Sequence, residues 1–142
     1  MKINLKRIII FFVILNFCTN LNADINHLKE GKQLFKNENY KKAKIEFEKD
    51  IVFNPKSEES YLYLAKIFNK EENNDLEENN LNTVILLNPR NEEAIYSLAI
   101  LSIKKSDFSK TEELIKTLGI VCTKLCSSKE ELQEKLKSSQ KQ

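Results

Sequence analysis

The chain has 142 residues, enough for one domain, and its 23 Lys and Arg nearly balance its 21 Asp and Glu. Only two Gly and two Pro among many charged helix formers favour an all-α fold. The single histidine, His27, excludes a histidine triad or a histidine metal cluster, and two solitary glycines exclude a phosphate-binding loop. We therefore expect no enzyme, no cofactor and no metal.

The first 23 residues have the features of a secretory signal peptide. Three basic residues precede an apolar run over residues 8–17, which is about half the length of a membrane span. Three outcomes stay open: cleavage near Ala23, lipidation of Cys18 after Leu15-Asn16-Phe17, or an uncleaved anchor. Each of them predicts an exported domain in the periplasm or cell envelope.

Removal of this segment changes the charge of the chain. It would take away three basic residues and no acid, leaving 20 Lys and Arg against 21 Asp and Glu, a formal charge of −1. Nucleic-acid-binding domains carry a basic footprint, which this domain lacks. We expect no nucleic-acid partner, and membrane contact only through an N-terminal lipid or anchor.

Apolar residues recur at helical spacing after residue 23. Helices are expected at residues 25–36, 40–53, 58–69, 70–87, 95–104 and 108–118, with a capping helix from Ser128. The fourth is rich in Asn from Lys70 to Asn82, which predicts a frayed first turn. Gly119 is expected to end or loosen the sixth helix, and the tail from Ser138 to be disordered.

Two of these helices end in similar tripeptides, Phe53-Asn54-Pro55 and Leu87-Asn88-Pro89, 34 residues apart. The same interval relates Gly31 to Ala65 and Ala99. Such a period predicts stacked helical repeats, and the chain resembles the tetratricopeptide repeat (TPR) family, whose unit is a helix-turn-helix of about 34 residues.

This resemblance implies a right-handed α-solenoid. Its repeat domain would span residues 24–126, with units at 24–57, 58–91 and 92–125, and residues 127–142 would form the capping helix and tail. In the family, small residues let the two helices of a unit approach closely, as Gly31 and Ala43 could in the first unit. Glu77 and Thr111 stand at the position of Ala43 in the next two units. There we expect either a local shift or a carboxylate that needs a partner or water.

The resemblance also implies a binding groove, because the first helix of each family unit lines the concave face. Three sets of residues repeat in register on these helices: an apolar line of Leu28, Leu62 and Tyr96, a pair of lysines, Lys32 and Lys66, and a second lysine line of Lys36, Lys70 and Lys104. They predict a cleft for an extended peptide or a helix with acidic side chains. The alternative is that lysines in the last turn only complement the helix dipole, which applies least to the mid-helix pair.

Some family members grip a C-terminal carboxylate with a fixed set of lysine, asparagine and arginine side chains. The corresponding residues here are Leu28, Lys32, Tyr63, Glu93 and Ser97. Only the lysine could serve, so we do not expect this type of carboxylate recognition.

Cys122 and Cys126 lie four residues apart near the end of the sixth helix. A cysteine pair in an exported protein favours a disulfide, but this spacing on a continuous helix does not suit disulfide geometry. The pair is bridged if the helix ends near Cys122, and otherwise the two thiols are buried or idle.

Two functional hypotheses follow. In the first, the domain is a protein–protein interaction module of the cell envelope that holds its partner in the concave groove. In the second, Cys18 is lipidated and the repeats serve as a structural or assembly subunit at the membrane.

Overall fold

The computed structural model describes residues 26–141, so the expected signal segment and the lipidation candidate Cys18 lie outside the described residues. Between residues 26 and 141 the chain forms seven α-helices and no strand. They are α2 (His27–Lys36), α3 (Tyr40–Phe53), α4 (Glu58–Lys70), α5 (Asn74–Leu87), α6 (Glu92–Lys104), α7 (Phe108–Val121) and α8 (Ser128–Ser139).

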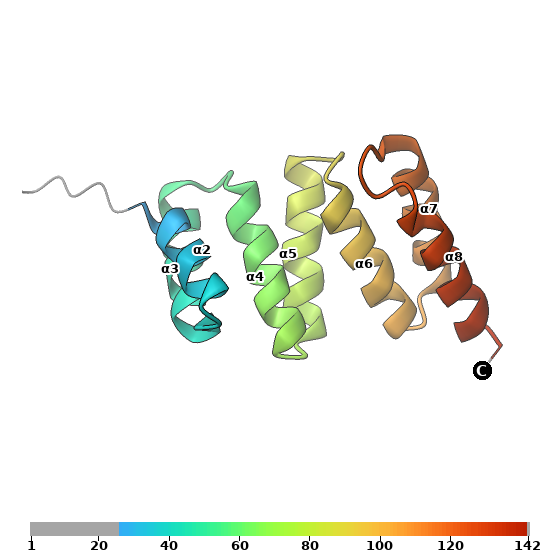
Figure 1. The fold of residues 1–142 in the computed structure, drawn as a ribbon, viewed down its shortest axis with the longest axis horizontal. Helices are drawn as coiled ribbons and strands as arrows, with labels where there is room; N and C mark the ends of the chain where they lie inside the picture. The colour runs from blue at the N-terminus through green and yellow to red at the C-terminus, as the bar shows by residue number, and fades with distance from the viewer. Residues whose placement is uncertain (1–25, 142) are drawn as a thin grey trace, which may run out of the picture.

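The helices form three antiparallel pairs, α2 with α3, α4 with α5 and α6 with α7, and each pair packs on the next (Figure 1). The last helix, α8, packs on both α6 and α7. Three apolar clusters fill the spaces between successive pairs and between the last pair and α8. The expected all-α solenoid of three helix-turn-helix units with a C-terminal capping helix is therefore confirmed.

The turns inside the three pairs have the same conformation at the same interval. Glu38, Glu72 and Ser106, each 34 residues from the next, have φ values of 59°, 56° and 58°. Residues other than glycine rarely adopt this left-handed conformation. Its repetition shows that the 34-residue register extends to single backbone angles.

The second helix of the middle pair differs from its prediction. It begins at Asn74 and not at Lys70, which is the last residue of α4. Its first turn is capped, because Asn73 accepts a hydrogen bond from Leu76 N at 3.2 Å. Asparagine is a poor residue inside a helix but a good N-cap, so composition alone misjudged this segment.

The last two helices also run further than expected. Gly119 does not end α7, which continues to Val121, and Ser138 and Ser139 belong to α8 instead of a disordered tail. The side chain of Lys129 lies against Gly119, where an added Cβ would be 3.1 Å from its Nζ. Contact with α8 therefore supports the end of α7.

The helices α2 and α3 approach each other closely at the small residues, as the sequence predicted. A Cβ atom on Gly31 would lie only 2.7 Å from the ring of Phe47, and Ala43 is fully buried. Ala65 and Ala99, at the same register position as Gly31, are also buried.

Candidate functional site

A cavity of about 330 Å³ opens between α4, α5 and α6. Four of the predicted groove residues line it: Leu62, Lys66, Lys70 and Tyr96. The other lining residues are Phe35, Ala65, Asn69, Glu77, Leu81, Glu93, Ser97 and Ile100. The structure thus brings half of the predicted set together around one hollow.

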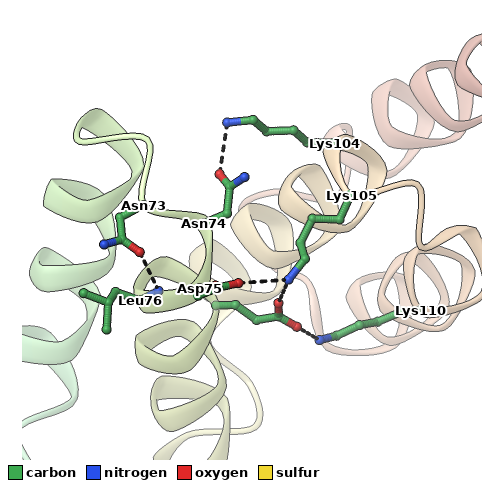
Figure 2. Close-up of polar contacts among 8 residues, drawn as sticks. Asn73, Asn74, Asp75, Leu76, Lys104, Lys105 and Lys110 are labelled. Carbon is green, nitrogen blue, oxygen red and sulfur yellow. Dashed lines mark hydrogen bonds and ion pairs between the residues drawn. The ribbon is translucent and has the colours of Figure 1, made fainter.

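The other predicted residues lie elsewhere. Leu28 packs against the apolar cluster between α2, α3 and α4, and Lys32 and Lys36 do not line the cavity. Lys104 lies at the end of α6, where its Nζ donates to Asn74 Oδ1 at 3.0 Å (Figure 2). The cavity therefore takes in only part of the predicted groove, which stays a prediction over the rest of its length.

Lys104 borders a network of charges at the turn edge of the solenoid. Lys105 Nζ lies 2.5 Å from Glu78 Oε2 and 3.5 Å from Asp75 Oδ1, and Lys110 Nζ lies 2.6 Å from Glu78 Oε1. The hydrogen bonds from Lys105 and Lys110 lower the pKa of Glu78. The network joins α5 to α6 and α7 and is best explained as support for the stack.

Lys32 and Lys66 make equivalent contacts between repeats. Lys32 forms an ion pair with Glu59 at the start of α4, and Lys66 Nζ lies 2.7 Å from Glu93 Oε1 at the start of α6. Both pairs join residues 27 apart and both are partly exposed. Each lysine therefore links its unit to the next, and its charge is already paired within the chain.

Lys70 and Tyr96 line the cavity from two different helices, α4 and α6. Lys70 is exposed, and its Nζ lies 4.9 Å from the centre of the Tyr40 ring. Tyr96 donates its hydroxyl to Glu131 Oε1 of α8 at 3.1 Å. Burial, followed by this hydrogen bond, raises the pKa of the Tyr96 phenol. Tyr96 is thereby held in place by the capping helix.

A buried carboxylate lies at the floor of the cavity. Glu77 is only 3% exposed, and both its carboxylate oxygens accept hydrogen bonds from Asn69 Nδ2, at 3.0 and 3.1 Å. Burial raises its pKa, while the bond from Asn69 and the charge of Lys104 oppose that shift. The predicted need of Glu77 for a partner is thus met inside the chain.

Glu77 and Asn69 were not predicted as site residues, although one signal was available. Glu77 replaces the small residue expected at its register position, and a carboxylate at a packed seam requires a donor. The cavity therefore combines two cations, Lys66 and Lys70, with two carboxylates, Glu77 and Glu93. Such a lining suits a partner that offers both apolar and polar side chains.

The cysteine pair lies outside this cavity, in the connection between α7 and α8. Cys122 and Cys126 form a disulfide with their Cα atoms 5.2 Å apart. The helix ends at Val121, and Cys122 is extended with φ −64° and ψ 143°. This departure from helical geometry is the condition under which a bridge over four residues becomes possible.

The loop closed by this disulfide surrounds the carboxylate of Glu92, in the first turn of α6. Glu92 accepts hydrogen bonds from the backbone N–H groups of Thr123, Lys124 and Leu125 at 2.7, 2.9 and 2.7 Å. With the Thr123 hydroxyl, these donors lower the pKa of Glu92 to about 2. One repeat earlier, Glu58 accepts from Asn88 Nδ2 at 3.0 Å, so each first-turn glutamate holds the following interrepeat loop.

The described residues offer no candidate metal site. Between residues 26 and 141, no group of three or more His, Cys, Asp or Glu side chains could hold a metal ion. His27 lies at the start of α2, stacked on Phe53 with ring centres 5.7 Å apart and with Nδ1 2.7 Å from Glu46 Oε2. None of the helices from α2 to α8 is long and apolar enough to cross a membrane.

Among known proteins, only solved structures proved similar to this chain. No family model matches it. No curated protein matches it either.

Solved structures do match. The Yersinia enterocolitica type III secretion translocator chaperone SycD superposes with a TM-score of 0.75 at 12% identity, over 92% of this chain and 94% of that one. The C-terminal TPR-containing domain of a Plasmodium falciparum FK506-binding protein has a TM-score of 0.67 at 17% identity, over 84% and 92%.

A third match is the CopN–Scc3 complex, with a TM-score of 0.66 at 17% identity. That match covers 76% of this chain but only 65% of the length of the other. The neighbours are TPR-containing and TPR-like helical proteins, so the chain has the fold of the tetratricopeptide repeat family.

Proposed function

We propose that this protein is an exported protein-binding module of the cell envelope, which holds a peptide or a partner helix in the cavity between α4, α5 and α6. The observation that carries the proposal is the convergence of Lys66, Lys70 and Tyr96 from successive repeats around one hollow of about 330 Å³. That volume lies at the lower end of the range for ligand clefts, and it suits a few side chains of a larger partner.

Structural neighbours support this function. One structure of SycD holds a peptide of the translocator YopD, and it superposes on this chain with a TM-score of 0.72, over 86% of this chain and 97% of that one. CopN and Scc3 form a complex with each other. A binding role for the present repeats agrees with these neighbours and needs none of the groups that catalysis would require.

The cavity favours a partner with a mixed surface. Acidic side chains would meet the exposed ammonium group of Lys70, since the other lysine of the cavity, Lys66, is already paired with Glu93. A neutral hydrogen-bonding side chain could approach Asn69 and Glu77 at the floor. We therefore expect an acidic segment with apolar or amide anchors.

Capture of the partner from an envelope extract tests the proposal. We expect Lys32→Glu with Lys66→Glu and Lys70→Glu to weaken capture strongly, and high salt to weaken capture by the unchanged protein. Lys41→Glu, Lys42→Glu and Lys137→Glu make a control with the same charge change on exposed residues away from the cavity. Equal capture by all three proteins would overturn the groove assignment.

A second variant separates weaker binding from loss of folding. Glutamate at positions 32 and 66 would face Glu59 and Glu93, whereas Lys70 takes part in no ion pair between residues 26 and 141. The single change Lys70→Glu should therefore reduce capture and leave the thermal midpoint nearly unchanged.

A second candidate function rests on Leu15-Asn16-Phe17-Cys18, which resembles a lipoprotein signal. In that case the lipidated protein would act as a structural or assembly subunit at the membrane. Mass spectrometry of the mature N-terminus separates the two. A diacylglyceryl-cysteine at Cys18 favours the lipoprotein, and a start near Asp24 favours the released binding module.

A further inference from the structure

One edge of the solenoid carries a repeated pair of exposed side chains. The next-to-last residues of α3, α5 and α7 are Val52, Leu86 and Ile120, which are 73%, 81% and 74% exposed. They lie 34 residues apart. Single exposed apolar residues are common on proteins, but three at one register position are not explained by chance exposure.

A basic residue follows each of them after four positions. Lys56, Arg90 and Lys124 are also 34 residues apart, and all three are exposed. Within residues 26–141 none of their side chains takes part in an ion pair. Each interrepeat connection thus presents one apolar and one cationic side chain.

The antiparallel arrangement places all of these residues on the same edge. The ends of α3, α5 and α7 meet the beginnings of α4, α6 and α8 there, while the turns within pairs lie on the opposite edge (Figure 1). Four of the six large exposed apolar residues between residues 26 and 141 belong to this edge: Val52, Phe53, Leu86 and Ile120. We call Val52, Leu86, Ile120, Lys56, Arg90 and Lys124 the loop edge.

Most nearby carboxylates are already satisfied within the chain. Glu92 is held by backbone N–H groups, Glu58 by Asn88, and Asp50 accepts from Ser60 Oγ at 2.5 Å. An exposed acid, Glu48, precedes Val52 by one turn, but Asn82 and Lys116 replace it in the next two repeats. The charge that the loop edge offers to a partner is therefore mainly positive.

The start of the described chain lies on the same edge. His27, the first residue of α2, stacks on Phe53, the last residue of α3. The described chain therefore begins at the loop edge.

We propose that the loop edge is a docking surface for a bilayer containing anionic phospholipids. Apolar side chains alternating with cations suit the boundary between acyl chains and headgroups, where the apolar groups insert and the cations meet phosphates. A protein interface would instead be expected to gather its apolar residues at a continuous centre with charges at the rim. This surface is distinct from the partner cavity and adds a direct lipid contact to the protein.

Cosedimentation with vesicles tests the docking surface. A protein of residues 26–142 is suitable, because all three apolar clusters of the fold lie between Leu28 and Leu136. It should sediment with vesicles of phosphatidylcholine and phosphatidylglycerol, should bind phosphatidylcholine alone much less, and should be released by salt.

Two sets of substitutions separate the contribution of the cations to vesicle binding from that of the apolar side chains. Lys56→Gln with Arg90→Gln and Lys124→Gln should weaken binding about a hundredfold, since each cation near an anionic surface contributes about fivefold. Val52→Ser with Leu86→Gln and Ile120→Gln should also abolish most binding. Lys41→Gln with Lys42→Gln and Lys137→Gln, a charge-matched control on exposed residues outside the loop edge, should bind as the unchanged protein does.

The proposal is overturned if the unchanged protein does not bind anionic vesicles, or if the three variants bind them equally. It is also overturned if light scattering shows a dimer that the apolar substitutions dissociate while vesicles are not bound. In that case a second copy, and not a bilayer, would cover the loop edge.

Discussion

The contact between the two helices of a repeat, which we call the seam, is apolar in the first repeat and polar in the second. In the first, Gly31 and Ala43 let the helices approach, and the ring of Phe47 fills the seam. In the second, Ala65 faces a helix that carries Glu77, whose carboxylate is held by Asn69. The first seam is closed and apolar, whereas the second is polar and borders the cavity. A repeat can thus keep its backbone register while one position changes from a small apolar residue to a buried, hydrogen-bonded carboxylate.

The apolar seam should be the more sensitive to loss of volume. Phe47→Ala removes a fully buried ring and should lower the free energy of unfolding by about 3–5 kcal/mol. Urea denaturation followed by circular dichroism measures it. Gly31→Ala provides the reverse test, because its Cβ would clash with Phe47. Its cost should shrink in a Phe47→Leu background, and an unchanged cost would show that the two residues do not share the seam.

The polar seam should depend on its donor. Asn69→Ala leaves the Glu77 carboxylate buried without its amide partner and should cost about 1.5–3 kcal/mol at neutral pH. The control is Asn82→Ala, which changes an exposed asparagine of the next helix. If both variants unfold at the same urea concentration, the bond between Asn69 and Glu77 does not stabilise the second repeat.

Enlarging Ala65, the small residue of the second repeat, should lower the free energy of unfolding by a similar or smaller amount than Asn69→Ala. Ala65→Leu adds volume at a position that is 2% exposed and should cost about 1–3 kcal/mol. The adjacent cavity sets the size of the effect, because side chains can shift into it. A neutral result in the same denaturation experiment would mean that this helix crossing is not tight.

The smallest expected effects on stability come from Glu92 and Glu77, whose ionisation makes stability depend on pH in opposite directions. The pKa of Glu92 falls from 4.5 to about 2 on folding, so its contribution is complete above pH 4.5 and is lost as pH falls towards 2. Burial raises the pKa of Glu77, so its ionisation costs stability as pH rises above 4.5.

Thermal midpoints between pH 2 and 7 distinguish these two carboxylates. Glu92→Gln should flatten the acid side of the profile, and Glu77→Gln should remove the decline above pH 4.5. The assignments fail if Glu92→Gln leaves the acid side as steep as before, or if Glu77→Gln keeps the decline.

The repeat architecture could be predicted because its signal is local and recurrent. A 34-residue interval related Gly31, Ala65 and Ala99, and the structure finds all three buried as expected. The fourth helix was misjudged, since the propensity of asparagine inside helices hid the capping role of Asn73. Composition describes what a segment contains, whereas capping depends on a single position.

The candidate site was less predictable because it depends on contacts between repeats. Lys32 and Lys66 were expected to meet a partner, but in the structure they form ion pairs with Glu59 and Glu93 of the next unit. A repeated lysine–glutamate separation of 27 residues, also present in Lys44 and Glu71, was the available signal. The pairing of Asn69 with Glu77 across a turn had no repeated counterpart in the sequence.

Hydrogen exchange of the mature protein, alone and with its co-purified partner, tests most directly whether the cavity between α4, α5 and α6 is the binding site. The proposal predicts new protection of backbone amides in α4 and α6 around Lys66, Lys70 and Tyr96, and little change near Val52, Leu86 and Ile120. Protection confined to the ends of α3, α5 and α7, with none around the cavity, would contradict it.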